Sequence, residues 1–267
     1  MAEKFELSTK GQKLIELYAL MAKEGYSRTD GTVEKDAYNK FQLAKFRHII
    51  LPHLKINNIK TVLDYGSGGS DWDREDFDDE SKKSAKDFFS LDSVEKYEPA
   101  RDIDQRSKSE CVVCIDVLEH IFALDVLGVL NDIFSHAEKL VVLNVACYKA
   151  SAMLPNDENA HITVRDPLWW KGVLDTVSIQ FPAVSVVLIC SPTFGSCKIF
   201  ECWKADDWKH DEKFTIDMPK ATNFGDIPNE NNDIEISKDQ LFDLIKSYIE
   251  QSARNRIEVI DLISKNL

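Results

Sequence analysis

The sequence predicts an α/β protein built on a doubly wound, mostly parallel sheet. Three short apolar runs carry this prediction, because each one ends in or is followed by a carboxylate. They are Thr61–Tyr65 with Asp64, Ser93–Tyr97 followed by Glu98, and Glu110–Asp116. A glycine-rich turn, Gly66–Ser70, follows the first run, and glycine lets a ligand approach the backbone closely. In an open parallel sheet, ligands bind beyond the carboxyl ends of the strands, so we expect these carboxylates to lie around one site.

Composition indicates a globular protein with no bias towards nucleic acid or membranes. The 267 residues can form one large domain or a core of about 150 residues with additions. Hydrophobic residues make up 43% and charged residues 30%, which is ordinary for a globular chain. The net charge of -13 argues against nonspecific attraction to phosphate backbones or anionic lipid, although it leaves room for a local basic patch.

The sequence also predicts a cytoplasmic location with reduced thiols. The opening residues, Met1–Glu6, have no apolar stretch typical of a secretory signal, and no segment reaches the roughly 20 apolar residues that span a bilayer. Cys111 and Cys114 form a C-x-x-C pattern, but they fall within an expected strand. Positions three apart in a strand point to opposite faces, so we expect buried thiols rather than a redox or zinc pair.

Residues 1–54 are expected to form a helical cap. Ser8 or Thr9 can begin a first helix and Gly25 can end it, and Asp30-Gly31 marks a turn. A second helix is expected to include Tyr38, Phe41 and Ile49–Leu51, with Pro52 disturbing its end. These helices either pack on the core or also form a lid over the substrate.

Residues 55–204 are expected to form the core. The acidic stretch Ser70–Glu80 is long for a loop between a strand and a helix. Further helices are expected over 82–89, over 124–136 and from Asp166-Pro167, and a further strand over 140–146. The runs 184–190 and 198–203 predict an antiparallel hairpin at the sheet edge. Only about a dozen residues separate Pro99 from Glu110, so one edge strand is expected to be short or missing.

The remaining residues divide into two expected segments. Residues 205–237 are polar and predict a linker. Residues 238–267 carry an apolar stripe that includes Leu241, Ile245 and Ile249, which predicts a helical extension. Such a stripe packs on the protein's own core or, alternatively, forms a homodimer interface.

The three strand-end motifs, taken in order, resemble those of class I S-adenosylmethionine-dependent methyltransferases. The resemblance covers roughly Lys55 to Lys204 and implies a Rossmann-like fold with a mostly parallel, seven-stranded sheet. It rests on Asp64-Tyr-Gly-Ser-Gly-Gly69, on Glu98, and on Asp116-Val-Leu-Glu-His120. The block Leu154–Thr163, with Trp169-Trp170 after it, is similar to a subgroup of uncharacterised bacterial and phage methyltransferases.

The resemblance implies that S-adenosyl-L-methionine is the cofactor. Its implied binding residues are Asp64, Tyr65, Gly66, Ser67, Gly68, Glu98, Pro99, Asp116 and Val117. Asp64 and the glycine backbone would hold the methionine end, and Pro99 and Ala100 would lie against the adenine. Glu98 suits the ribose for a chemical reason as well, because a carboxylate can accept hydrogen bonds from two hydroxyl groups. Asp102 and Asp104 are candidates for the adenine amine.

A nicotinamide cofactor is disfavoured by the glycine pattern. Asp71 occupies the position where a dinucleotide-binding turn has its third glycine, and the acidic residues that follow would repel a pyrophosphate.

Methyl transfer requires little of the protein beyond orientation of the acceptor, because orientation alone can lower the activation barrier by ~7–11 kcal/mol. A general base helps when the acceptor carries a proton, and His120 and His161 are the candidates. Trp169 and Trp170 are expected to wall the acceptor pocket, with one of them in the core. The predicted reaction methylates oxygen or nitrogen of a small-molecule or sugar-like acceptor.

Two alternatives remain open. Asp116, Glu119, His120 and His161 are similar to the metal site of small-RNA 3′-end 2′-O-methyltransferases, with Asp where that family has Glu. Carboxylates and imidazoles could hold Mg²⁺ or Mn²⁺ and polarise an acceptor hydroxyl. The second alternative is a non-catalytic protein that binds the cofactor, or acts through its helices.

Overall fold

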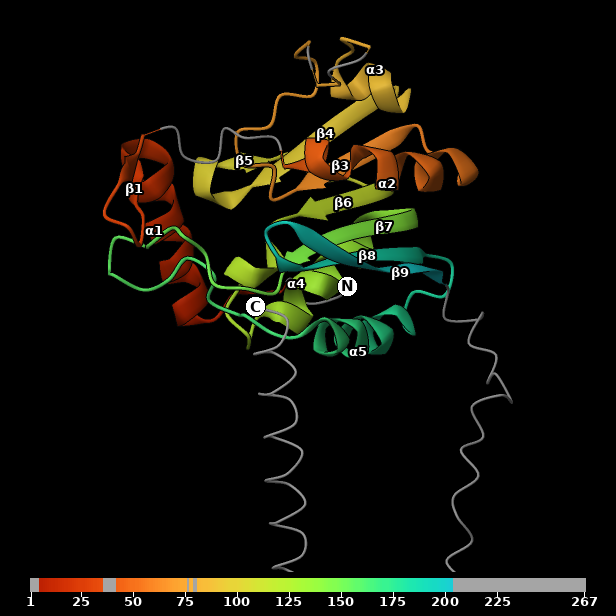
Figure 1. The fold of residues 1–267 in the computed structure, drawn as a ribbon. Coiled ribbons are helices and arrows are strands. Elements are labelled where there is room, and N and C mark those ends of the chain that lie inside the picture. Colours follow the sequence, from red (N-terminus) through yellow and green to blue (C-terminus); the bar gives the residue numbers. More distant parts are fainter. Residues whose placement is uncertain (1–4, 36–41, 76, 79–80, 204–267) are drawn as a thin grey trace, which may run out of the picture. The chain divides into compact units, whose positions relative to one another are not determined.

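A seven-stranded sheet forms the centre of the protein (Figure 1). The computed structural model describes residues 5–35, 42–75, 77–78 and 81–203. The strands are β3 (Thr61–Tyr65), β4 (Ser93–Glu98), β5 (Ile103–Asp104), β6 (Ser109–Ile115), β7 (Ala137–Ala146), β8 (Ser185–Thr193) and β9 (Ser196–Trp203). Their order is β5-β4-β3-β6-β7-β8-β9. The five inner strands are parallel, and β5 and β9 are antiparallel edges, which confirms a mostly parallel α/β sheet with a short edge strand and a terminal hairpin.

Helices cover both faces of the sheet. On one face α2 (Leu43–Ile56) and α3 (Ala85–Phe89) pack, and on the other α4 (Val126–His136) and α5 (Pro167–Ser178). The strands alternate between these two cores, so Val62 joins the first and Leu63 the second. Cys111 and Cys114 divide in the same way, and both are buried free thiols, as the strand period predicts.

Before α2, the described residues 5–35 form one helix and a small hairpin. Ser8 caps α1 (Thr9–Glu24) by accepting a hydrogen bond from the Gly11 amide, and Gly25 ends the helix, both as expected. Two short strands, β1 (Tyr26–Ser27) and β2 (Val33–Glu34), pair across the turn that contains Asp30-Gly31.

The expected end of the second helix at Pro52 is wrong, because α2 continues through this proline to Ile56. Proline removes one N–H donor from the helix. Ile50 and Leu54, on either side of it, are fully buried in the core, and this packing outweighs the local preference. The part of the expected helix before residue 42 lies outside the described residues.

The long acidic stretch is anchored at Trp72 and Asp78, whereas Asp71 and residues 73–75 are exposed. Trp72 is buried, and Arg47 of α2 forms an ion pair of 3.0 Å with Asp78. The helix expected from residue 82 begins only at Ala85, where Ser84 provides the cap. The helix expected from 124 begins at Val126, and the strand expected from 140 begins earlier, at Ala137.

The expected linker, 205–237, and the expected helical extension, 238–267, lie outside the described residues. Within the described part of the chain, no helix is both long enough and apolar enough to cross a membrane.

Loss of a leucine side chain from either core should lower the free energy of unfolding far more than loss of an exposed leucine. Leu63 is 0% exposed in the centre of β3, whereas Leu124 is 75% exposed. Leu63→Ala is expected to lower the free energy of unfolding by about 2–5 kcal/mol, because it leaves a cavity. Leu124→Ala should change it by less than about 0.5 kcal/mol. Urea unfolding followed by circular dichroism measures both, and equal effects would contradict this assignment of the core.

Candidate functional site

The carboxyl ends of β3, β4 and β6 meet at one edge of the sheet. β3 lies between the other two strands, with Val62 opposite both Val94 and Cys111. The chain leaves β3 towards β4 and returns to β6 on its other side, so the topological switch point lies between β3 and β6. Ligands bind at this point in open α/β sheets. Asp64, Glu98 and Asp116 therefore surround the expected site, each at the end of its own strand or just beyond it.

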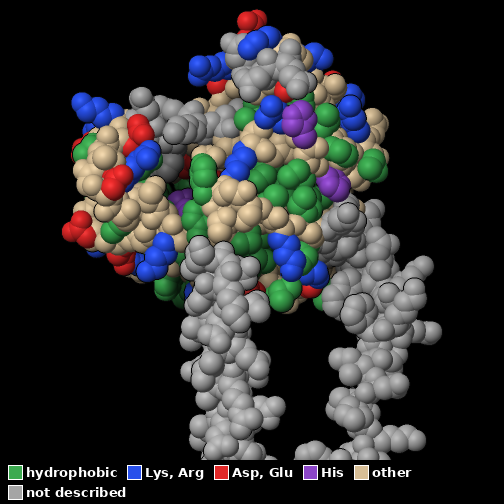
Figure 2. All heavy atoms as spheres, in the orientation of Figure 1, with side chains coloured by type: hydrophobic (Ala, Val, Ile, Leu, Met, Phe, Trp, Pro, Cys, Tyr) green, Lys and Arg blue, Asp and Glu red, His purple; other side chains and the backbone are tan. Residues whose placement is uncertain are grey.

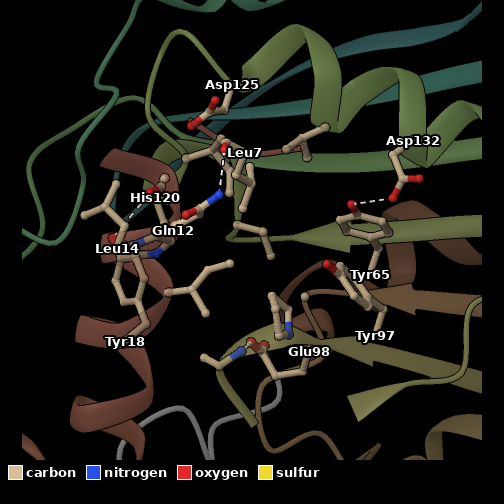
Figure 3. A pocket seen from close by; sticks show the side chains of 18 of the residues that line it. Leu7, Gln12, Leu14, Tyr18, Tyr65, Tyr97, Glu98, His120, Asp125 and Asp132 are labelled. Carbon is tan, nitrogen blue, oxygen red and sulfur yellow. Dashed lines mark hydrogen bonds between the residues drawn. The ribbon is translucent and has the colours of Figure 1, made fainter. Parts of the chain in front are cut away.

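A cavity of about 870 Å³ opens at this edge (Figure 3). Its walls come from the ends of β3, β4 and β6, from α4 and from α1. Figure 3 shows Tyr65, Tyr97 and Glu98 along the sheet side and Leu14 and Tyr18 projecting from α1. The volume is within the range of small-molecule and cofactor sites. Because α1 forms one wall, the N-terminal residues cover this cavity as well as packing on the protein.

The Glu98 carboxylate is fixed by two backbone amides. Oε2 accepts a hydrogen bond from Gly68 N at 2.8 Å, and Oε1 accepts one from Ala100 N at 3.0 Å. Each carboxylate oxygen has a second lone pair, so two further donors can bind. Burial raises the pKa of Glu98, and the two amide hydrogen bonds oppose this shift. The carboxylate is therefore both oriented and partly desolvated before any ligand arrives.

Gly66 is required by both conformation and space. Its φ is +79°, and an added Cβ would lie 2.4 Å from Cγ2 of Val117. The amides of Gly66 and Ser67 both donate to the Tyr97 carbonyl, at 2.7 and 3.0 Å. These bonds tie the turn after β3 to the end of β4, next to Glu98. Any side chain at position 66 would disturb this junction.

Asp64 is buried and already hydrogen-bonded within the protein. Its Oδ2 accepts from the Ser70 hydroxyl at 2.7 Å and from Trp72 Nε1 at 2.8 Å. Burial raises its pKa, and these two hydrogen bonds oppose the shift. Asp64 lines a second, smaller cavity of about 260 Å³ rather than the larger one.

The two cavities adjoin. Four residues line both of them: Gly66, Gly68, Asp116 and His120. Beyond this shared wall, the smaller cavity is lined by the segment after β7, including Tyr148 and His161, and by Asn144. A molecule that fills the larger cavity would therefore face a second molecule in the smaller one across Asp116 and His120.

Both histidines present the same ring nitrogen to the backbone. His120 Nδ1 lies 2.8 Å from the Ala160 carbonyl, and His161 Nδ1 is hydrogen-bonded to the Tyr148 carbonyl. A carbonyl only accepts, so Nδ1 carries the proton in each ring and Nε2 keeps its lone pair. Burial, followed by the nearby His161 ring, lowers the pKa of His120 to about 4. His120 is therefore neutral at pH 7.

Glu119 completes a cluster with these histidines. One ligand atom from each of Glu119, His120 and His161 lies within 4.8 Å of the others. Glu119 is 0% exposed; its Oε1 accepts from Ala146 N at 2.6 Å, and its Oε2 has no hydrogen-bond partner among the described residues. Burial, and then the charge of Asp116, raises the pKa of Glu119 well above its usual range. A cation bound here would favour the ionised form instead.

The larger cavity is acidic. Six carboxylates and two guanidinium groups line it: Glu6, Glu98, Asp104, Asp116, Asp125 and Asp132, against Arg101 and Arg106. Arg106 is in turn paired with Asp104 and Asp132, at 2.6 and 2.8 Å. The cavity therefore favours a cationic ligand over an anionic one.

On the face of the molecule shown in Figure 2, basic side chains are interspersed with acidic and other residues.

The structure brings most of the residues expected from the sequence to these two cavities. Tyr65, Gly66, Gly68, Glu98, Pro99, Asp116, Val117 and His120 line the larger one. Asp64, Ser67 and His161 line the smaller one. Of the two adenine candidates, Asp104 lines the larger cavity and Asp102 lines neither.

The two tryptophans lie elsewhere. Trp170 is fully buried in the core against α4, and Trp169 is 37% exposed. Neither lines either cavity, because α5 begins at Pro167 and packs along the sheet face. The expectation that one of the pair belongs to the core agrees with the structure, but the expected acceptor wall does not form from them.

Several residues of the site carried no clear signal in the sequence. Tyr18 and Gln12 face the larger cavity from α1, and Trp72 reaches Asp64 from the long acidic loop. The Tyr65 hydroxyl donates a hydrogen bond to Asp132 Oδ2 at 2.8 Å. The only signal for Tyr18 is its place in a helical apolar stripe, which does not distinguish a cavity wall from a core.

Comparisons with protein-family models, with curated proteins and with solved structures found no match to this chain.

The environment of Asp64 gives a prediction about stability. Asp64→Asn keeps an oxygen for Ser70 and Trp72 while it removes a buried charge, so it should be at least as stable as the parent at pH 7. A raised folded pKa means that the parent loses stability as pH rises from about 3.9 through that pKa, so the advantage should shrink towards pH 4. Urea unfolding at pH 7, 5 and 4 measures this.

Trp72→Phe is the matched comparison, because it removes a donor and keeps the charge. It should cost about 1–3 kcal/mol at pH 7. An Asp64→Asn variant that is less stable than the parent by this amount would contradict the described hydrogen bonding.

Proposed function

We propose that this protein is an S-adenosyl-L-methionine-dependent methyltransferase that acts on oxygen or nitrogen of a small-molecule or sugar-like acceptor. The observation that carries the proposal is the position of Glu98. Its carboxylate is held by Gly68 N and Ala100 N at the edge of a large cavity and has capacity for two more donors. The 2′- and 3′-hydroxyls of a ribose supply two donors at that spacing.

The charge of the larger cavity supports a sulfonium nucleoside over a dinucleotide. The excess of carboxylates suits a positively charged sulfonium and opposes a pyrophosphate. Dinucleotide sites also place the pyrophosphate at a helix N-terminus directly after the glycine turn. Here β3 ends at Tyr65 and, among the described residues, the next α-helix begins only at Ala85, so none of them forms an α-helix directly after the turn.

When bound, the cofactor supplies an electrophilic methyl group. The protein's residues would then bind, orient and exclude water. Glu98 holds the ribose, and Gly66 and Gly68 allow close approach of the backbone. Asp64 lines the smaller cavity and would receive the methionine ammonium. The acceptor would enter the smaller cavity and meet the methyl group near Asp116 and His120, which line both cavities.

His120 and His161 would orient the acceptor and accept its proton. With Nδ1 bonded to a backbone carbonyl, each ring directs an Nε2 lone pair away from that carbonyl. The lowered pKa makes His120 a weak base, so its larger contribution is a fixed hydrogen-bond acceptor for the nucleophile.

Binding of S-adenosylhomocysteine, measured by calorimetry, tests the proposal. Glu98→Ala should weaken binding by about 100-fold, because two ribose hydroxyls lose a charged acceptor. Glu95→Ala is the matched control; it lies on the same strand and bonds Ser107 rather than the cavity, so it should bind as the parent does. Equal binding by the parent and Glu98→Ala, or no binding by the parent, would contradict the proposal.

A metal-assisted methyltransferase, including one that acts on RNA 2′-hydroxyls, is the second candidate. The cluster of Glu119, His120 and His161 favours it. Two imidazole nitrogens and a buried carboxylate oxygen without a partner suit Mn²⁺ or Mg²⁺, and the backbone carbonyls orient both rings. The acidic net charge and the small second cavity argue against a long RNA acceptor.

Manganese binding, followed by electron paramagnetic resonance, tests this candidate. The parent should bind Mn²⁺, and Glu119→Gln and His161→Ala should each weaken binding at least 10-fold. His48→Ala changes an exposed histidine on α2 and should leave binding unchanged. Unchanged binding in both cluster variants would exclude this cluster as the metal site.

A further inference from the structure

The N-terminal residues contribute to both cavities. We define residues 5–34 as the cap segment and residues 148–165 as the acceptor loop. The cap segment lines the larger cavity through Leu7, which precedes α1, and through Leu14 and Tyr18 of α1 (Figure 3). It lines the smaller cavity through Tyr26 and Glu34. One continuous stretch of chain therefore covers two ligand spaces.

The cap segment packs on the acceptor loop through a hydrophobic cluster of its own. The buried members are Leu14 and Met21 from α1, and Leu154 and Ala160 from the loop. This cluster is separate from the two that cover the faces of the sheet. Two backbone hydrogen bonds reinforce it, from Met153 N to Ser27 O at 2.9 Å and from Thr29 N to Ser151 O at 2.8 Å. In Figure 1 the acceptor loop (green) lies beside α1 and β1.

Tyr18 links this assembly to the candidate catalytic histidine. Its hydroxyl donates to the Ala160 carbonyl at 2.6 Å and lies 3.2 Å from His120 Nδ1. His120 Nδ1 bonds the same carbonyl, at 2.8 Å. The Tyr18 and His120 rings meet edge to face, with centroids 5.3 Å apart. The cap segment, the acceptor loop and His120 therefore meet at one carbonyl oxygen.

The other end of the cap segment is anchored on α4. The backbone N and the hydroxyl of Ser8 donate to the two oxygens of Asp125, at 2.9 and 2.8 Å. The Phe5 ring lies so close to Gly128 that an added Cβ would be 1.9 Å from it. Phe5 and Leu7 line the larger cavity, whereas Tyr18 contacts His120, which lines both cavities.

We propose that Tyr18 is a positioning residue through which the cap segment and the acceptor loop close as one body, so that a ligand in the larger cavity also orders the smaller cavity and fixes His120. The ligand's identity rests on the proposed function. Ordering by one ligand lowers the cost of ordering for the next, so the two ligands bind with positive coupling. By linkage, the acceptor strengthens cofactor binding by the same factor.

Hydrogen–deuterium exchange with and without S-adenosylhomocysteine tests the proposal in three full-length proteins. They are the parent, Tyr18→Phe and the control Lys10→Ala. Lys10 also joins the cap segment to the acceptor loop, through an ion pair of 2.6 Å with Glu158. The side chains of Lys10 and Glu158 are 36% and 43% exposed, so this ion pair should contribute little to the coupling.

In the parent and in Lys10→Ala, the ligand should protect both α1 and peptides from 148–165. In Tyr18→Phe, it should still protect α1, but protection of the acceptor loop should fall by about 10-fold, the factor that one net hydrogen bond supports. Equal loop protection in Tyr18→Phe and the parent would overturn the proposal. So would faster exchange throughout β6 and β7 in Tyr18→Phe, because that would give Tyr18 a merely structural role.

The same samples separate this inference from the proposed function. If the parent does not bind S-adenosylhomocysteine, the proposed ligand is wrong, but the exchange rates without ligand still decide the role of Tyr18. The acceptor loop should then exchange about 10-fold faster in Tyr18→Phe than in the parent, with β6 and β7 unchanged. An unchanged loop would overturn the role of Tyr18 independently of the ligand.

Discussion

The hydrogen bonding of β3 between β4 and β6 is the constraint on which the site depends. It places the ends of three parallel strands together, and with them Asp64, Glu98 and Asp116. The two amide bonds from the turn after β3 to the Tyr97 carbonyl then fix the turn against β4. Gly66 permits that approach, because no side chain fits between its backbone and Val117. The cavity, its acidic lining and the proposed ribose contact all follow from this packing.

The sheet alone provides only one wall of each cavity, and the N-terminal residues provide much of the other. This arrangement separates two tasks. The sheet edge supplies fixed polar groups, with Glu98 in the larger cavity and Asp64 in the smaller one, whereas α1 and the acceptor loop enclose the space. The two cavities meet at Asp116 and His120, and the cap segment reaches that point through Tyr18. Enclosure and orientation are the contributions that the proposed methyl transfer would most require of the protein.

Local patterns in the sequence predicted the elements that depend on local chemistry. The alternation of Cys111 and Cys114 between faces, the cap at Ser8, the helix start after Asp166 and the hairpin of β8 and β9 all agree with the structure. Each depends on residues only a few positions apart. The continuation of α2 through Pro52 does not, because it is decided by burial of Ile50 and Leu54 against distant strands. The partners of Asp64 and the place of Trp169 outside both cavities are likewise set by tertiary packing.

A crystal structure of the protein with S-adenosylhomocysteine would show where the nucleoside binds. We expect the nucleoside in the larger cavity, with both ribose hydroxyls about 3 Å from the Glu98 carboxylate and the sulfur near Asp116 and His120, which line both cavities. A ligand bound elsewhere, or one whose ribose does not contact Glu98, would contradict this expectation.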